Sequence, residues 1–252
     1  MDIHQIVNEK LNEIEMREHV KILHCVESGS RAWGFESPDS DYDIRFIYVH
    51  DKEWYLRLDE GRDVIEWQLD ETLDINGWDL KKTFQLLHNS NPTVFEWDKS
   101  PIVYRTTPEW SAIRKTLPKY FCQKTMLHHY LGTATGNYRN YLKSDEVRLK
   151  KYFYALRPVL ACEWVADKNC PPPMLFEELK AAYLPEYMLP TVDYLLELKK
   201  GTSEIGTGKR IDALNNYLDN EIGKFKELSK SLINKEYKGW DDLNDLFMQM
   251  LK

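Results

Sequence analysis

The chain has 252 residues, of which 42% are hydrophobic and 30% charged, which is ordinary for a globular protein with a sizeable core. Its formal net charge of −7 argues against a protein coated with basic surface for nucleic acid, but it leaves room for a local basic groove. No apolar run is long enough to cross a bilayer, and charged residues near the start interrupt any signal-peptide core, so a cytoplasmic location is expected. The four cysteines have no C-x-x-C spacing, and we expect neither a disulfide framework nor a zinc site.

The first third of the chain alternates between helical and extended patterns. Apolar residues at spacings of three and four predict a helix over residues 2–17. Apolar runs predict strands at residues 20–27 and 43–50. Alternation within residues 63–78 predicts further extended structure, in which we interpret Asn76-Gly77 as a turn.

Helical patterns dominate the rest of the chain. Leu80 to His88 predicts a helix that Asn91-Pro92 stops, and residues 102–104 predict a short extended segment. Further helices are expected over residues 110–141, 146–167, 175–183, 191–200, 211–232 and 240–250, with a flexible loop at 201–208. The expected fold class is α+β, with a small mixed-sheet head and flanking helices in residues 1–107 and an all-helical domain in residues 108–252.

The segment from Gly29 to Ile44 is the most informative part of the chain. A Gly-Ser turn, Gly29-Ser30, follows the first strand, and Asp41 and Asp43 lead into the second. Residues i and i+2 of a strand point to the same side, so the two carboxylates should converge. Carboxylate oxygens suit Mg²⁺, and a glycine-containing turn with free N–H groups and a hydroxyl is a typical phosphate loop. These features predict a site for a metal-bound nucleoside triphosphate.

A site with two divalent ions needs about three carboxylates, so a third acid should come from a neighbouring strand. Asp74 lies between two apolar residues and is the best candidate, because a strand should hold it firmly. Glu66, Asp70 and Glu71 are its rivals.

Other residues are candidates for binding the nucleotide. Arg31 could add a charge-assisted bond to the phosphates, or could be an ordinary surface arginine. The segment around Lys150 and Lys151 is locally basic. If it is helical, Lys150, Tyr154 and Arg157 share one face at spacings of four and three. That face could grip a triphosphate from the side opposite the metals, or it could be a solvated face with a core tyrosine.

The order of these motifs resembles the signature of the DNA polymerase beta-type nucleotidyltransferase superfamily. Further segments between about residues 28 and 158 are similar to a subgroup of predicted nucleotidyltransferases of bacteria and phages, some found beside RNA ligases. They include Ser-Asp-Tyr-Asp-Ile-Arg-Phe-Ile-Tyr-Val and Lys-Lys-Tyr-Phe-Tyr-Ala-Leu-Arg-Pro. The resemblance implies a nucleotidyltransferase head with a helical C-terminal part that contributes to the nucleotide cleft. It also implies that Asp74 binds the metal that activates the acceptor, and that Asp74 acts as the general base.

The expected activity is transfer of a nucleoside monophosphate from a nucleoside triphosphate, such as ATP, to an acceptor hydroxyl with release of pyrophosphate. Two Mg²⁺ ions are expected as cofactors, with Mn²⁺ as an alternative. The acceptor could be an RNA end, a small molecule or a protein; the sequence identifies neither the acceptor, the base nor the oligomeric state. Two alternatives stay open: an Asp-x-Asp glycosyltransferase that uses a nucleotide-sugar, and a non-catalytic binding partner on the same fold.

Overall fold

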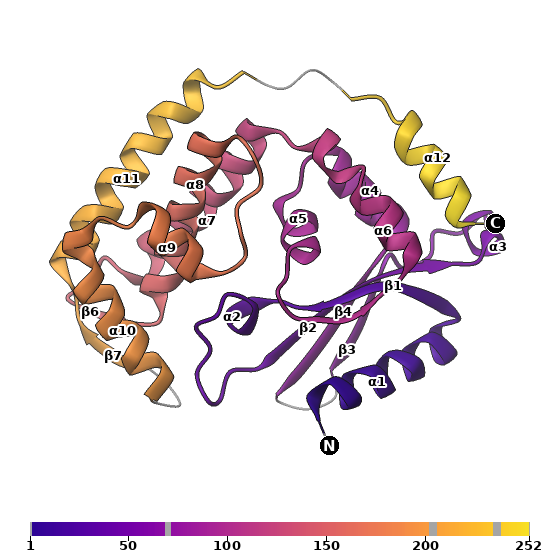
Figure 1. The fold of residues 1–252 in the computed structure, drawn as a ribbon, viewed down its shortest axis with the longest axis horizontal. Helices are drawn as coiled ribbons and strands as arrows, with labels where there is room; N and C mark the ends of the chain where they lie inside the picture. The colour runs from indigo at the N-terminus through magenta and orange to yellow at the C-terminus, as the bar shows by residue number, and fades with distance from the viewer. Residues whose placement is uncertain (1, 69–71, 202–205, 234–237, 252) are drawn as a thin grey trace. The chain divides into compact units, whose positions relative to one another are not determined.

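The computed structural model of the chain describes residues 2–68, 72–201, 206–233 and 238–251. The chain forms two compact units (Figure 1). The first unit consists of Met1–Ala32, Asp41–Tyr120 and Tyr237–Lys252. The second unit consists of Trp33–Ser40 and Phe121–Glu236.

A five-stranded mixed sheet is the centre of the first unit, and its strand order is β3-β4-β2-β1-β5. Strand β2 runs antiparallel to β1 and parallel to β4, while β3 and β5 pair antiparallel with β4 and β1. The strands are β1 (Val20–Glu27), β2 (Tyr42–His50), β3 (Val64–Gln68), β4 (Leu73–Asp79) and β5 (Val103–Thr106). The mixed sheet with flanking helices confirms the expected fold class.

Helices cover both faces of this sheet, with α1 on one face and α4 on the other (Figure 1). The helices of the first unit are α1 (Ile3–Glu18), α2 (Gly29–Ala32), α3 (Lys52–Tyr55), α4 (Leu80–His88), α5 (Pro92–Asp98), α6 (Pro108–Arg114), the 3₁₀ turn Leu117–Tyr120 and α12 (Asp241–Met250). Side-chain caps begin several of them: Asp79 accepts a hydrogen bond from the Lys81 N–H at the start of α4, and Asn91 does the same for Thr93 in α5.

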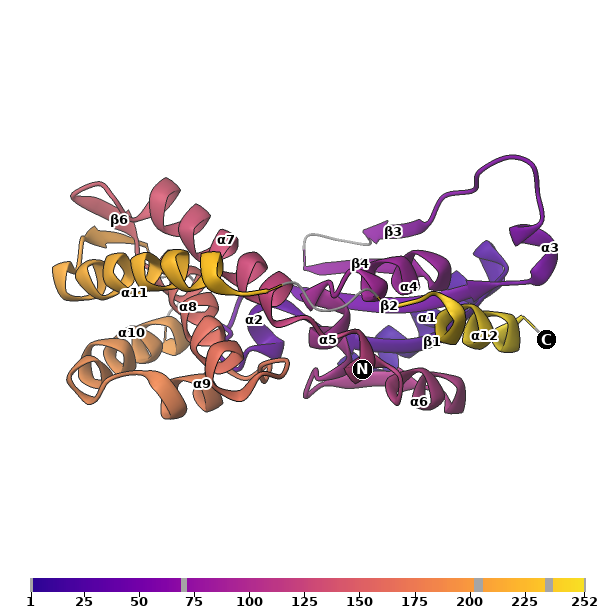
Figure 2. The same ribbon diagram turned by 90° about the horizontal axis from the view of Figure 1, so that it is seen from above.

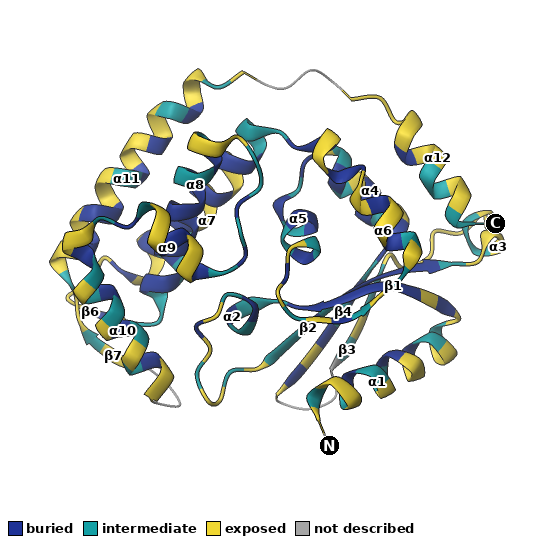
Figure 3. Cartoon of the chain, viewed as in Figure 1, coloured by how far each residue is buried: buried dark blue, intermediate teal, exposed yellow. Residues whose placement is uncertain are grey.

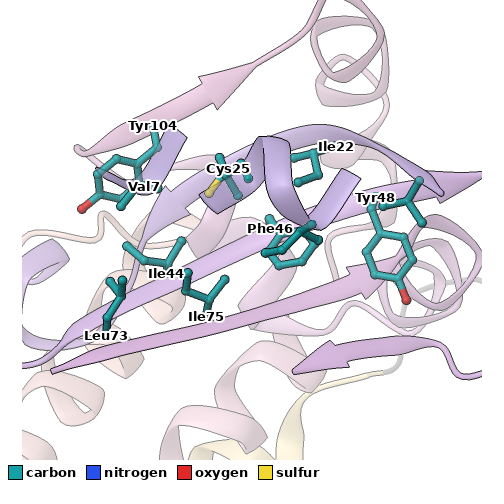
Figure 4. Close-up of a cluster of buried hydrophobic side chains, with 12 residues drawn as sticks. Val7, Ile22, Cys25, Ile44, Phe46, Tyr48, Leu73, Ile75 and Tyr104 are labelled. Atoms are coloured by element: carbon teal, nitrogen blue, oxygen red, sulfur yellow. The ribbon is translucent and has the colours of Figure 1, made fainter. Parts of the chain in front are cut away.

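The core of the first unit lies between α1 and the sheet (Figure 4). Val7, Leu11 and Ile14 of α1 are fully buried there, as the stripe with spacings of three and four predicts. Alternate residues of β2, Phe46 and Tyr48 among them, pack against this helix. The residues between them, including Asp43 and Arg45, therefore point to the opposite face of the sheet.

The second unit is mostly helical, and α7, α8 and α11 pack on one another at its centre (Figure 2). Figure 3 shows buried residues along these helices, where they pack, and along β1 and β2 of the first unit. The elements are α7 (Gln123–Tyr141), β6 (Glu146–Arg148), α8 (Lys151–Lys168), α9 (Phe176–Tyr183), the 3₁₀ turn Glu186–Met188, α10 (Leu189–Gly201), β7 (Thr207–Lys209) and α11 (Asp212–Ser231). No helix of the described residues has both the length and the apolar character that crossing a bilayer requires.

The segment Trp33–Ser40 packs within the second unit, although it comes between the two signature motifs. Phe35 is fully buried, and its ring stacks on Phe153 at 5.1 Å between centroids. The Phe35 carbonyl accepts a 2.6 Å hydrogen bond from the buried Lys199 ammonium, and the Trp33 carbonyl accepts one from the Phe176 N–H at 2.9 Å. Burial lowers the pKa of Lys199 to about 8.

Four local predictions differ from the structure. In the loop expected at residues 201–208, Gly201 ends α10, Thr207 begins β7, and residues 202–205 lie outside the described residues. Asn76-Gly77 is not a turn but part of β4, where a Cβ on Gly77 would meet the Phe46 ring at 2.2 Å. The helix expected over residues 110–141 is divided into α6, a 3₁₀ turn that contains Pro118, and α7. Residues 146–148 are not helical, because they pair with β7 as strand β6.

The units also divide the chain differently from the single boundary expected after residue 107. Residues 108–120 and α12 belong to the unit that holds the sheet. Phe247 of α12 packs edge-on against Tyr55 and near Phe84 of α4, which explains why the last helix returns to the first unit.

Candidate active site

Two of the predicted metal ligands are neighbours on parallel strands. Asp43 of β2 is the register partner of Asp74 of β4. Asp41 lies just before β2, two residues from Asp43, and is exposed. Neighbouring strands lie about 4.8 Å apart, so side chains in register on one face are adjacent. The structure therefore places Asp74 beside Asp43, on the same face of the sheet.

The rival acids are placed differently. Glu66 pairs in register with Asn76, not with Asp74, and its exposed carboxylate lies 3.6 Å from Arg62. It lines a cavity of about 500 Å³ near His50, at the end of β2 opposite Asp43. The other two rivals, Asp70 and Glu71, lie outside the described residues.

Arg45 connects the two neighbouring acids, and the sequence analysis missed it. Its Nη2 donates to Asp43 Oδ1 at 2.9 Å and to Asp74 Oδ2 at 2.7 Å. Its Nη1 donates to the carbonyl oxygens of Ile44 at 3.0 Å and of Asp74 at 3.1 Å. The sequence carries a signal for this contact, because a basic residue two positions after Asp43 in an apolar strand shares its face.

The Gly-Ser turn lies directly against Asp43. Gly29 has φ +60°, and a Cβ there would come within 2.0 Å of Asp43 Oδ2. The Ser28 N–H donates to the Asp43 carbonyl at 2.8 Å. The sequence predicts that this turn binds phosphate; in the structure the group that leaves no room for a side chain at Gly29 is the Asp43 carboxylate. Ser30, in α2, is largely buried, with 9% of its surface exposed.

Glu27, the last residue of β1, holds the backbone of Asp43 and was also missed. It is fully buried, and its Oε1 accepts a 2.7 Å hydrogen bond from the Asp43 N–H. Its Oε2 accepts a 2.6 Å bond from the Tyr104 hydroxyl, and its carbonyl accepts one from the Ser100 hydroxyl. Burial raises the pKa of Glu27, and the hydrogen bonds from the Tyr104 hydroxyl and the Asp43 N–H oppose that shift. Its trace in the sequence is an acid at the end of an apolar run, two residues before Gly29.

The electrostatics of the site fit a hard cation. Burial raises the pKa of Asp43, and the negative charges of Asp74 and Asp41 raise it further, while Arg45 lowers it. Carboxylates that disfavour one another's charge in this way are stabilised by a divalent ion, and oxygen donors suit Mg²⁺ or Mn²⁺. Binding of such an ion by Asp41 and Asp43 stays a prediction. Among the described residues, no group of three or more His, Cys, Asp or Glu side chains is placed so that it could hold a metal ion.

The Arg31 side chain contacts the backbone of Asp41. Its Nε donates to the Asp41 carbonyl at 3.2 Å, and its guanidinium lies 3.8 Å from the centroid of the Tyr42 ring. Both contacts fix the chain where it enters β2. Whether Arg31 also binds phosphate stays a prediction.

The other predicted nucleotide-binding cations, Lys150, Lys151 and Arg157, lie in the second unit. Lys151 begins α8, with Lys150 just before it, and the Lys151 ammonium lies over the rings of Tyr141 and Tyr154. Arg157 is buried, donates to the Met174 carbonyl, and lies over the Trp33 ring, which also contacts Tyr154 edge-on. These contacts give Arg157 a structural role. Binding of one nucleotide by this group and by the acids stays a prediction.

Comparison with known proteins identifies the family. The family model described as "RNA repair pathway DNA polymerase beta family" (RlaP) matches residues 3–249. A Bacillus subtilis (strain 168) protein named "Uncharacterized protein YcgL" is 41% identical over 252 residues, covering 98% of this chain and 96% of that protein. A crystal structure of a nucleotidyltransferase-like protein from Exiguobacterium sibiricum 255-15 is 12% identical, with a TM-score of 0.33, covering 91% of this chain and 75% of the other.

The family match spans nearly the whole chain, including the Gly-Ser turn, the three acids and the helical half. It agrees with the resemblance that the signature motifs imply. The chain therefore belongs to the RNA repair pathway DNA polymerase beta family, within the polymerase beta-type nucleotidyltransferase superfamily.

Proposed function

We propose that this protein transfers a nucleoside monophosphate from a nucleoside triphosphate to an acceptor hydroxyl and releases pyrophosphate, with a divalent ion at Asp41 and Asp43. The observation that carries the proposal is the pairing of Asp43 with Asp74 on parallel strands, beside the Gly29 turn. Two acids in register beside a Gly-Ser turn, at one end of one sheet, support nucleotidyl transfer, which needs charge neutralisation and a place for the phosphates.

Each residue has a definite task in this proposal. The acceptor oxygen attacks the α-phosphorus, the bond from that phosphorus to the pyrophosphate oxygen breaks, and the hydroxyl proton passes to Asp74. Half of the Asp74 side chain is exposed, so an acceptor can reach it. Bound Mg²⁺ supplies charge neutralisation for the phosphates. The Gly29-Ser30 turn orients the triphosphate, and Glu27 keeps Asp43 in place.

An RNA end is the acceptor that we favour among the three classes, because the family is described by an RNA repair pathway. The basic segment around Lys150 and Lys151 supports this choice, since phosphate contacts dominate RNA affinity. The cytoplasm is the proposed location.

The test is labelling with each α-³²P-labelled nucleoside triphosphate and Mg²⁺. Acceptors are RNA oligonucleotides with a free or blocked 3′ end, a metabolite extract and a protein extract. We expect label on the RNA with a free 3′ hydroxyl, and its loss in Asp43→Asn. Asp63→Asn is the matched control, because Asp63 is an exposed acid of the first unit that pairs with Lys82, away from this site. Transfer that Asp43→Asn leaves intact, or no transfer to any acceptor, contradicts the proposal. Label in another fraction contradicts only the choice of RNA.

A further inference from the structure

Arg45 lies where a cation between the two neighbouring acids would lie. One nitrogen, Nη2, is within 2.9 Å of an Asp43 oxygen and 2.7 Å of an Asp74 oxygen. A Mg²⁺ ion that joined these two carboxylates would need its oxygens at about 2.0–2.1 Å, in the same space. The guanidinium and a bridging ion therefore exclude each other at this point.

The contacts of Arg45 hold its guanidinium firmly. The two terminal nitrogens carry four N–H groups, and the structure gives four acceptors: two carboxylate oxygens and the carbonyls of Ile44 and Asp74. The two carbonyls belong to adjacent strands, so the position of the guanidinium is set by the sheet itself. Only 18% of the side chain is exposed. Arginine keeps its charge at any pH at which the protein folds, so this positive charge is permanent.

We propose that Arg45 supplies the positive charge between Asp43 and Asp74. The site then binds one divalent ion, at Asp41 and Asp43, and the Arg45 guanidinium takes the place of a second ion. This inference rests on the proposed function and changes the number of ions and the task of Asp74. Asp74 is then a partner of Arg45 and the acceptor of the hydroxyl proton, and it is not a metal ligand.

The test counts bound Mn²⁺ by electron paramagnetic resonance, first with Mn²⁺ alone and then with a non-hydrolysable ATP analogue. We expect one protein-bound ion per chain in the wild type. Asp41→Asn should weaken its binding at least about 10-fold, since loss of even an outer-shell partner costs a metal site that much. Asp74→Asn should leave the number of ions and their affinity unchanged.

Arg45→Gln tests the inference from the other side, because it removes the charge and opens the space between the carboxylates. We expect this variant to bind a second ion, and the double variant Arg45→Gln, Asp74→Asn to lose it again. Arg105→Gln is the matched control: Arg105 is also on a strand of the first unit, pairs with Glu15, and has 20% of its side chain exposed. It should bind one ion.

Two ions in the wild type, or loss of an ion in Asp74→Asn, would overturn the inference, and neither result depends on whether Arg45→Gln folds. A folded Arg45→Gln that still binds one ion would overturn it too. Failure of the proposed function looks different, because Asp41→Asn would then bind Mn²⁺ as tightly as the wild type.

Discussion

Gly29→Ala should destabilise the protein and displace its central acid. The new methyl group would stand 2.0 Å from Asp43 Oδ2 and 2.9 Å from its Cγ, which is closer than carbon and oxygen can approach. The backbone at Gly29 also has φ +60°, where a side chain costs about 1–2 kcal/mol. Forcing the carboxylate aside adds about 1–3 kcal/mol, as overpacking does elsewhere. The free energy of unfolding should therefore fall by about 2–5 kcal/mol.

Gly34→Ala separates the cost of the positive φ from the cost of the clash with the Asp43 carboxylate. Gly34 has φ +79°, but the nearest atom to its added Cβ is the end of the Leu175 side chain, at 3.2 Å. Both variants stiffen the unfolded chain equally, so that contribution cancels. Denaturant titration should show Gly29→Ala less stable than Gly34→Ala by about 1–3 kcal/mol. Mn²⁺ affinity should fall only in Gly29→Ala.

Equal stability of Gly29→Ala and Gly34→Ala would refute this reasoning, because it would mean that the Asp43 carboxylate moves aside at no cost in free energy. So would an unchanged Mn²⁺ affinity in Gly29→Ala, since the predicted ligand would then have stayed in place despite the methyl group.

Three further predictions follow from buried or basic groups. Glu27→Ala should weaken Mn²⁺ binding at Asp43 about 10-fold or more. Glu27→Gln should keep most of the Mn²⁺ affinity, because the glutamine side chain can still accept a hydrogen bond from the Asp43 N–H. An equal loss of affinity in both variants would contradict a positioning role for Glu27. Burial lowers the pKa of His24 to about 4. As the pH falls, His24 therefore takes up a proton in the unfolded chain before it does so in the folded one, and the free energy of unfolding should decrease by about 3 kcal/mol from pH 6.5 to pH 4. His24→Phe should flatten that slope in denaturant titrations. Lys150→Ala should weaken nucleoside triphosphate binding, measured by calorimetry, about 10-fold. Unchanged affinity in this variant would place Lys150 outside the nucleotide site. Arg157→Ala should chiefly lower stability, because the buried Arg157 guanidinium donates a hydrogen bond to the Met174 carbonyl.

The sequence was sufficient for features that depend on local pattern. The apolar run of β2 placed Asp41 and Asp43 at the head of a strand, and the apolar neighbours of Asp74 placed it on another. The spacing of three and four in α1 identified its buried face. These features need only the geometry of a single helix or strand, which the chain encodes within a few residues.

Features that depend on register between strands could not be predicted in this way. The Arg45 bridge requires that β2 and β4 pair with Asp43 opposite Asp74, and the Glu27 contact requires β1, β2 and β5 together. Gly77 was misinterpreted for the same reason, because a glycine that makes room for the Phe46 ring and a glycine in a turn look alike in the sequence.

The segment Trp33–Ser40 has a consequence for engineering and for evolution. The loop that joins Ser30 to Asp41 buries Phe35 among helices of the other unit, where its ring contacts Phe153 and Phe176. A truncated protein that ends after residue 120 would expose Phe35 to water, at a cost of about 1.5–3 kcal/mol, and would leave the spacing between its two signature motifs unsupported. The sheet cannot be grafted onto a different helical partner unless this loop is redesigned as well. The two halves should therefore be inherited, exchanged and expressed together.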